Sequence, residues 1–92
     1  MPDSKILTLH PTSGKTGRNI NRQTYDLFKA ALLDILRGQE LNHNQLFEQL
    51  NQNLQGKFAG NIGWYGETIK LDLEARGLIQ RTNSKPQKYR LK

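Results

Sequence analysis

The sequence predicts an α+β fold in which three helices precede a C-terminal β-hairpin and a short strand lies near the N-terminus. Two observations predict this order. Apolar residues recur at three- and four-residue spacing in three segments, and each segment is followed by a glycine that can end a helix. After the third glycine, apolar and polar residues alternate, which is the period of a half-buried strand.

The first predicted helix covers residues 22–37, after a short strand at residues 5–9 and a loop at residues 10–19. Asn21 is the expected N-cap, because its side-chain oxygen can accept hydrogen bonds from the first turn. Gly38 supplies the left-handed residue that ends the helix. The apolar face consists of Tyr25, Phe28, Ala31, Leu32, Ile35 and Leu36.

The second predicted helix begins after Asn42 and ends before Gly56. Asn42 and Gln45 have the spacing of a capping box. Leu41 and Leu46 stand where a hydrophobic staple would form at the same end. This end of the helix therefore carries two independent start signals.

The third predicted helix begins at Asn61 or Ile62, runs to Arg76 and is stopped by Gly77. Its apolar face consists of Ile62, Tyr65, Ile69 and Leu73. Four-residue spacing predicts two ion pairs along the helix, each contributing only about 0.3–0.5 kcal/mol. The two pairs are Lys70 with Glu74 and Asp72 with Arg76.

Residues 78–82 and 88–91 are predicted strands, joined by a turn at residues 83–87 that contains Asn, Ser and Pro. This order of elements is that of a winged helix-turn-helix domain, in which the terminal hairpin is the wing. A three-helix bundle with a frayed tail is the alternative, and the alternation in residues 88–91 argues against it. The 92 residues make one domain, with residues 1–20 as a basic strand and loop and residues 21–92 as the winged helix.

The net charge of +6 is concentrated at the two ends of the chain. Residues 1–22 have four bases and one acid, residues 23–75 have four bases and seven acids, and residues 76–92 have six bases and no acid. Basic segments outside a balanced core indicate a polyanionic partner, and a solubilising tail is the alternative. No apolar run has the length of a membrane span and the N-terminus lacks a signal-peptide pattern, so we expect a cytoplasmic protein.

The chain is not expected to be an enzyme. It has no cysteine, and His10 and His43 lack carboxylates at ligand spacing, so neither a disulfide nor a metal site is predicted. Residues 13–17 are similar to a phosphate loop, but Leu9 stands where that motif requires a glycine. We therefore expect a basic loop there, with at most a phosphate contact. No nucleophile–base pair is recognisable, and neither a cofactor nor a small-molecule substrate is predicted.

Two stretches carry a resemblance to known winged-helix proteins. Residues 71–81 and 89–91, with their L-E-x-x-G-L-I and Y-x-L patterns, resemble the junction of recognition helix and wing in bacterial winged-helix regulators. Residues 56–77 resemble the stretch G-K-F-x-G-x-I-G-W-Y-x-x-T-x-K-L-D-L-E-A-R-G of a set of small bacterial winged-helix proteins from an uncharacterised family. The resemblance implies a winged helix-turn-helix fold and the DNA-binding role of a transcription regulator.

Double-stranded DNA is therefore the expected partner. The third helix, residues 61–76, would lie in the major groove, and the hairpin, residues 78–91, would contact phosphates. Glu67 departs from this expectation, because a carboxylate that faces the groove repels phosphate. The candidate nucleic-acid-binding residues are Lys57, Asn61, Trp64, Thr68, Lys70, Arg81, Lys85, Lys88 and Arg90.

The single tryptophan supports a second hypothesis. Trp64, Thr68, Leu71 and Ala75 form a stripe at helical spacing, which we expect the N-terminal strand and loop to cover. A homodimer interface or an exposed protein-binding site would use the same stripe. The alternative function is therefore a protein–protein interaction module of winged-helix fold that does not bind DNA.

Overall fold

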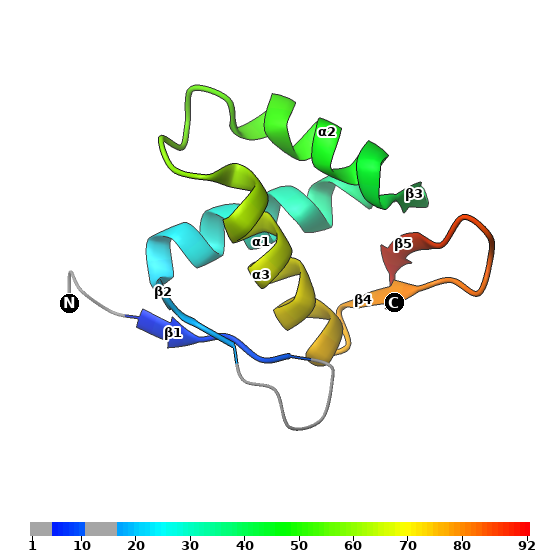
Figure 1. The fold of residues 1–92 in the computed structure, drawn as a ribbon, viewed down its shortest axis with the longest axis horizontal. Helices are drawn as coiled ribbons and strands as arrows, with labels where there is room; N and C mark the ends of the chain where they lie inside the picture. The colour runs from blue at the N-terminus through cyan, green and yellow to red at the C-terminus, as the bar shows by residue number, and fades with distance from the viewer. Residues whose placement is uncertain (1–4, 11–16) are drawn as a thin grey trace.

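The computed structural model describes residues 5–10 and 17–92. This part of the chain has three helices and two small antiparallel sheets, which agrees with the predicted α+β class (Figure 1). The helices are α1, Arg22–Ile35, α2, His43–Leu54, and α3, Ile62–Ala75. The strands are β1, Lys5–Leu7, β2, Asn19–Asn21, β3, Leu41–Asn42, β4, Ile79–Arg81, and β5, Lys88–Leu91. Residues 13–16 of the predicted basic loop lie outside the described residues.

α1 and α2 begin at the capping residues that the sequence predicts, and α3 begins at Ile62, one of its two predicted starts. Asn21 accepts hydrogen bonds from two backbone N–H groups in the first turn of α1. Asn42 forms the predicted capping box with Gln45, and Asn61 accepts a hydrogen bond from the N–H of Trp64 at 2.9 Å. These side chains satisfy N–H groups that the first turn of a helix leaves without partners. A glycine with φ between 74° and 80° follows each helix, at Gly38, Gly56 and Gly77.

Two strands are absent from the prediction. β2 pairs with β1, so residue 19, predicted to lie in a loop, belongs to a strand. Both ends of β2 are asparagine, a residue that strands disfavour, and the local sequence therefore gives no strand signal. β3 is only two residues long and precedes α2 directly. Both strands form because a segment distant in sequence pairs with them. The local sequence pattern cannot predict such pairing.

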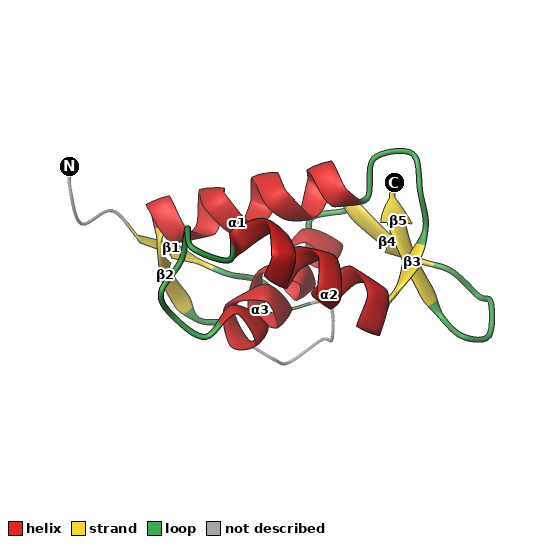
Figure 2. Cartoon of the chain, turned by 90° about the horizontal axis from the view of Figure 1, so that it is seen from above, coloured by secondary structure: helices red, strands yellow, loops and turns green. Residues whose placement is uncertain are grey.

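The second sheet joins the loop between α1 and α2 to the C-terminal hairpin. Its strand order is β3-β5-β4, with Leu41 opposite Tyr89 and Gln80 opposite Arg90. The β1–β2 hairpin and this sheet lie at opposite ends of the helical layer (Figure 2). Three helices with a three-stranded sheet of this order are compatible with a winged-helix-like arrangement.

The core lies between the three helices and is closed at its ends by the sheets. Gly66 on α3 allows a close approach to α2, since a Cβ there would lie 2.7 Å from Leu50 and 2.8 Å from Phe47. Phe58 from the loop before α3 packs edge-on against Phe28, with ring centroids 4.9 Å apart. The fully buried apolar side chains include Phe28, Leu32, Leu46, Leu50, Leu54, Ile69 and Leu73.

One carboxylate, that of Asp72, is fully buried in α3 and connects three parts of the fold. The hydroxyl of Tyr25 on α1 donates a hydrogen bond to it. The backbone N–H of Leu9 donates at 2.7 Å, and Nε of Arg76 donates at 2.9 Å. Burial, followed by the hydrogen bond to Asp72, raises the pKa of Tyr25 to about 12. The N-terminal hairpin and α1 are thus both tied to α3 through one side chain.

We expect Tyr25→Phe to lower the free energy of unfolding by about 1–3 kcal/mol, because Asp72 would lose one donor without access to water. Since the pKa of Tyr25 is raised on folding, its contribution is fully present below pH 10 and is lost as pH rises towards 12. The difference in free energy of unfolding between wild type and Tyr25→Phe, measured by urea unfolding, should therefore become smaller as pH rises over this range.

Tyr65→Phe is the matched control for this substitution. The Tyr65 ring packs against Phe28 and Phe58, and its hydroxyl makes no hydrogen bond within the described part of the chain. It should change stability little. Equal effects of the two substitutions would contradict the role assigned to the Tyr25 hydroxyl.

Candidate nucleic-acid interface

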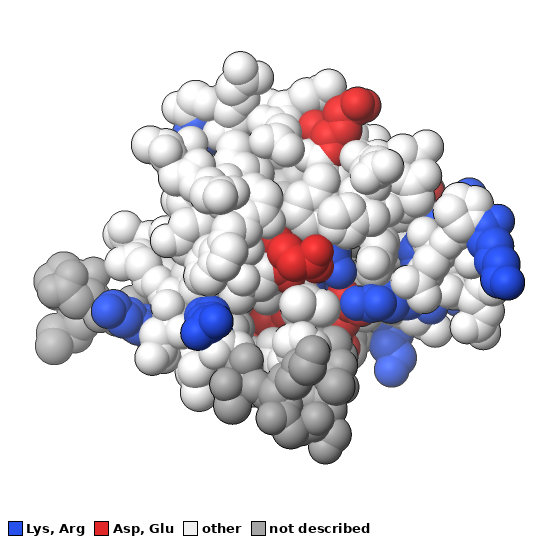
Figure 3. Space-filling model, viewed as in Figure 1, with Lys and Arg blue, Asp and Glu red and all other residues white. Residues whose placement is uncertain are grey.

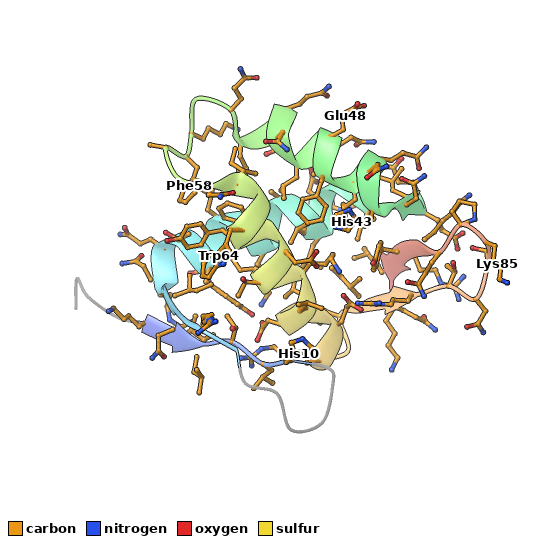
Figure 4. The ribbon with its side chains drawn as sticks, viewed as in Figure 1. His10, His43, Glu48, Phe58, Trp64 and Lys85 are labelled. Carbon is orange, nitrogen blue, oxygen red and sulfur yellow. The ribbon has the colours of Figure 1, made fainter. Side chains whose placement is uncertain are left out.

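The outward surface of α3 carries a small set of mostly neutral side chains. Asn61 and Trp64 are exposed, and Thr68 and Leu71 are half-buried. The Trp64 ring packs edge-on against Tyr65 at 4.9 Å, while 46% of the residue stays exposed. Figure 4 shows Trp64 on the part of α3 nearest its N-terminal end. These are the residue types that can contact base edges or a sugar.

The tryptophan stripe is covered only in part. Thr68 and Leu71 line a groove of about 250 Å³ between α3 and the N-terminal segment, together with Leu9 and Arg18. Trp64 also lines this groove, but nearly half of it remains exposed. The expected cover by the N-terminal strand and loop is therefore present over Thr68 and Leu71 and incomplete over Trp64, and residues 11–16 of that loop lie outside the described residues. The segment that follows β1 passes beside the second half of α3, where the N–H of Leu9 donates a hydrogen bond to Asp72.

Glu67 is engaged by two bases and does not present a free carboxylate. Its oxygens lie 3.1 Å from Nε2 of His43 and 3.1 Å from Nζ of Lys70. Partial burial acts to raise the pKa of Glu67, but the charge and hydrogen bonds of Lys70 and His43 outweigh it and lower the pKa below its ordinary value. The repulsion of phosphate that the sequence suggested is reduced by these partners.

Lys70, a candidate for DNA contact, lies in the interior of the protein. Its side chain is 1% exposed, and its Nζ lies 2.8 Å from Glu74 and 4.3 Å from the centre of the Tyr89 ring. An ammonium group in this position cannot reach a phosphate, so we leave Lys70 out of the interface. The sequence suggested a solvent-facing position because charged residues are rarely buried unless they are paired.

The two predicted ion pairs of α3 are both present, but they are not weak surface pairs. Lys70 and Glu74 are both buried, and Asp72 is fully buried beside a partly exposed Arg76. Burial makes each pair costly to break, because one partner would be left charged without water. The contribution of about 0.3–0.5 kcal/mol expected for an exposed pair on a helix therefore does not apply to these two pairs.

The β4–β5 hairpin has two kinds of cation. Arg81 forms an ion pair with Glu74, and Arg90 forms one with Glu40 at 2.9 Å, so both attach the hairpin to the body of the protein. Within the described residues, the other cations of this segment make no ion pair. They are Lys85, Lys88 and Lys92. Figure 3 shows the blue side chains gathered over the hairpin, beside the face of α3.

Two further cations lie in loops, and only Arg18 lines a groove with α3, whereas Lys57 lines one with residues of α1. Lys57, a predicted contact residue, is exposed in the loop between α2 and α3. Arg18 was not among the predicted contacts, yet it lines the groove next to Trp64. The sequence offers only its charge as a signal, since its position depends on the pairing of β1 with β2.

Residues 5–89 match the model of a family of unknown function, DUF6958. The chain belongs to this family. No curated protein and no solved structure matches it. None of the helices in the described part of this DUF6958 chain has the length and apolar character that crossing a membrane requires. The described residues also contain no cluster of three or more side chains that could hold a metal ion.

For this DUF6958 chain, we expect Lys70→Met to lower the free energy of unfolding by about 1.5–3 kcal/mol, because the buried Glu74 loses one charge-assisted hydrogen bond and keeps only Arg81 as an ion-pair partner. Lys85→Met is the matched control, since Lys85 is exposed and makes no ion pair with described residues. It should stay within about 0.5 kcal/mol of wild type. Urea unfolding measures both. A mild effect of Lys70→Met on stability would argue against its structural role.

Proposed function

We propose that this protein binds double-stranded DNA through a winged helix-turn-helix fold, with α3 in the major groove and the β4–β5 hairpin on the phosphate backbone. The observation that carries the proposal is a hairpin that follows α3 and carries cations without ion pairs to described residues, Lys85, Lys88 and Lys92, where Figure 3 shows blue side chains gathered. Cations on one short hairpin suit a phosphate backbone, and a helix next to them suits a groove.

The order of the elements supports the winged-helix assignment. α2 and α3 are consecutive helices joined by residues 55–61, and the hairpin follows α3 directly. β3 pairs with β5, which places the hairpin against the start of α2. In this proposal the hairpin is the wing and α3 is the recognition helix.

The outward face of α3 supplies the groups that would contact bases. The amide of Asn61 and the hydroxyl of Thr68 can exchange hydrogen bonds with base edges, and the ring of Trp64 can pack on a thymine methyl group or a sugar. Asn61 already accepts a hydrogen bond from Trp64, so its NH₂ group is the part left for DNA. Glu67 stays with His43 and Lys70.

The phosphate contacts would come from the lysines that are not used within the protein. Lys85 and Lys88 lie on or beside the turn of the hairpin, and Lys57 lies in the loop before α3. Arg81 and Arg90 hold the hairpin through Glu74 and Glu40, and we assign them mainly to its positioning. Phosphate contacts fix orientation and affinity, while α3 would supply any preference for sequence. A protein that occupies DNA in this way can act as a transcription regulator.

We expect the wild-type protein to bind a short labelled duplex of random sequence at about 50 mM salt and to release it as salt approaches 200 mM. Lys85→Ala/Lys88→Ala should weaken binding and reduce the slope of log K against log salt by about 1.8, or 0.9 for each lost phosphate contact. Fluorescence anisotropy over a salt series measures both quantities.

Lys5→Ala/Lys29→Ala is the control, because it removes the same charge from β1 and α1, outside the proposed contacts, and neither lysine forms an ion pair with described residues. This control should reduce the slope of log K against log salt much less than Lys85→Ala/Lys88→Ala does. The proposal is wrong if the wild-type protein fails to bind at low salt and tens of micromolar protein, or if both double variants behave alike.

The protein–protein interaction module remains a second candidate because apolar side chains are exposed on α3 and on the N-terminal segment. Trp64 is 46% exposed, Leu9 43% and Leu7 55%. Aromatic and aliphatic side chains in such positions suit an interface with a homodimer partner or another protein. Sedimentation equilibrium of wild type and Trp64→Ala, with no DNA present, distinguishes this candidate. Self-association that Trp64→Ala abolishes, without DNA binding, would favour it.

A further inference from the structure

The pairing of β1 with β2 places Arg18 on the side of the hairpin that faces α3. Ile6 pairs with Ile20, and both pack against the core. Successive residues of a strand point to opposite faces, so Arg18, two residues before Ile20, lies on the same face. Arg18 lines the groove beside α3. Lys5, adjacent to Ile6, lies on the opposite face of the hairpin.

The backbone at Arg18 is held in place by three hydrogen bonds with the buried Thr8. The N–H of Arg18 donates to Oγ1 of Thr8 at 2.7 Å, and the carbonyl of Arg18 accepts from Oγ1 at 3.1 Å and from the Thr8 N–H at 2.9 Å. Gly17 makes this approach feasible, because a Cβ there would lie 2.1 Å from the Thr8 carbonyl oxygen. The hairpin in turn is fixed to α3 by the bond from Leu9 to Asp72.

The groove between α3 and this hairpin is suited to an anion that carries a flat or apolar part. Arg18 contributes a positive charge, Thr68 a hydroxyl and Trp64 a half-exposed ring. None of the described residues that line the groove is acidic. Asp72, which lies next to it, is fully buried and holds Tyr25, Leu9 and Arg76. Arg18 makes no ion pair within the described part of the chain.

We propose that this groove seats the phosphate–sugar backbone of one DNA strand, with Arg18 on a phosphate and Trp64 packed on the adjacent sugar. The inference rests on the proposed DNA-binding function and adds a second contact arm to it. A helix in the major groove, about 12 Å wide, has a phosphate backbone on each side. α3 likewise lies between the β1–β2 hairpin and the β4–β5 hairpin (Figure 1).

The test compares Arg18→Gln with Lys5→Gln, which removes the same charge from the other face of the same hairpin. Arg18→Gln should weaken duplex binding about tenfold, the loss expected for one charge-assisted hydrogen bond, and lower the salt slope by about 0.9. Lys5→Gln should have a much smaller effect on both. Arg18→Lys should keep most of the slope, because it keeps the charge while losing the planar fork.

Two further readouts separate a contact from a structural effect. The hydrogen bonds to Thr8 use the backbone of Arg18, so thermal unfolding by circular dichroism should be unchanged in Arg18→Gln. Emission from Trp64, the only tryptophan, should shift when the duplex is added.

The outcomes also separate this inference from the function on which it rests. If the wild-type protein does not bind the duplex, both fail. The second outcome is that the wild-type protein binds the duplex and Lys85→Ala/Lys88→Ala weakens this binding. If Arg18→Gln then has the same affinity and salt slope as Lys5→Gln, and Trp64 emission does not change, only the contact at Arg18 is overturned.

Discussion

The buried carboxylate of Asp72 holds together the parts of the protein that surround α3. It accepts hydrogen bonds from Tyr25 on α1, from the backbone of Leu9 and from Arg76 at the end of α3. A buried carboxylate is costly unless its oxygens are satisfied, so this site is stable only when all three elements are in place. The N-terminal hairpin therefore has a fixed position beside α3, although it is joined to α1 by sequence and carries little core of its own.

A second buried charge, Lys70, ties α3 to the β4–β5 hairpin on the other side of the helix. It lies between Glu67 and Glu74 and under the ring of Tyr89, and Glu74 in turn holds Arg81. Most of the charge on α3 is thus committed to the fold. The outward face is left with Asn61, Trp64 and Thr68, and in the proposed complex the helix would add shape and a few polar contacts. The affinity would come mainly from the cations on either side.

Local signals were sufficient to predict the helices and the hairpin. The caps at Asn21 and Asn42 and the three glycines that follow the helices act within a few residues, and each was placed correctly because capping depends only on neighbouring backbone. β2 and β3 were not predicted, since their pairing depends on distant segments. The burial of Lys70 and the position of Arg18 depend on the same tertiary contacts. For this reason the predicted interface included a buried lysine and omitted an arginine that lines the groove.

Salt would act differently on the buried and the exposed charges of this protein. Buried pairs such as Lys70 with Glu74 are screened little by salt, because water and ions do not enter between them. Exposed cations such as Lys85 are screened strongly. Salt that removes the protein from a polyanion would therefore leave the buried ion pairs around α3 in place, while it weakens the exposed pair between Arg90 and Glu40 on the β4–β5 hairpin. Binding could then respond to ionic strength while the buried pairs around α3 stay formed, because the two sets of charges share no residue.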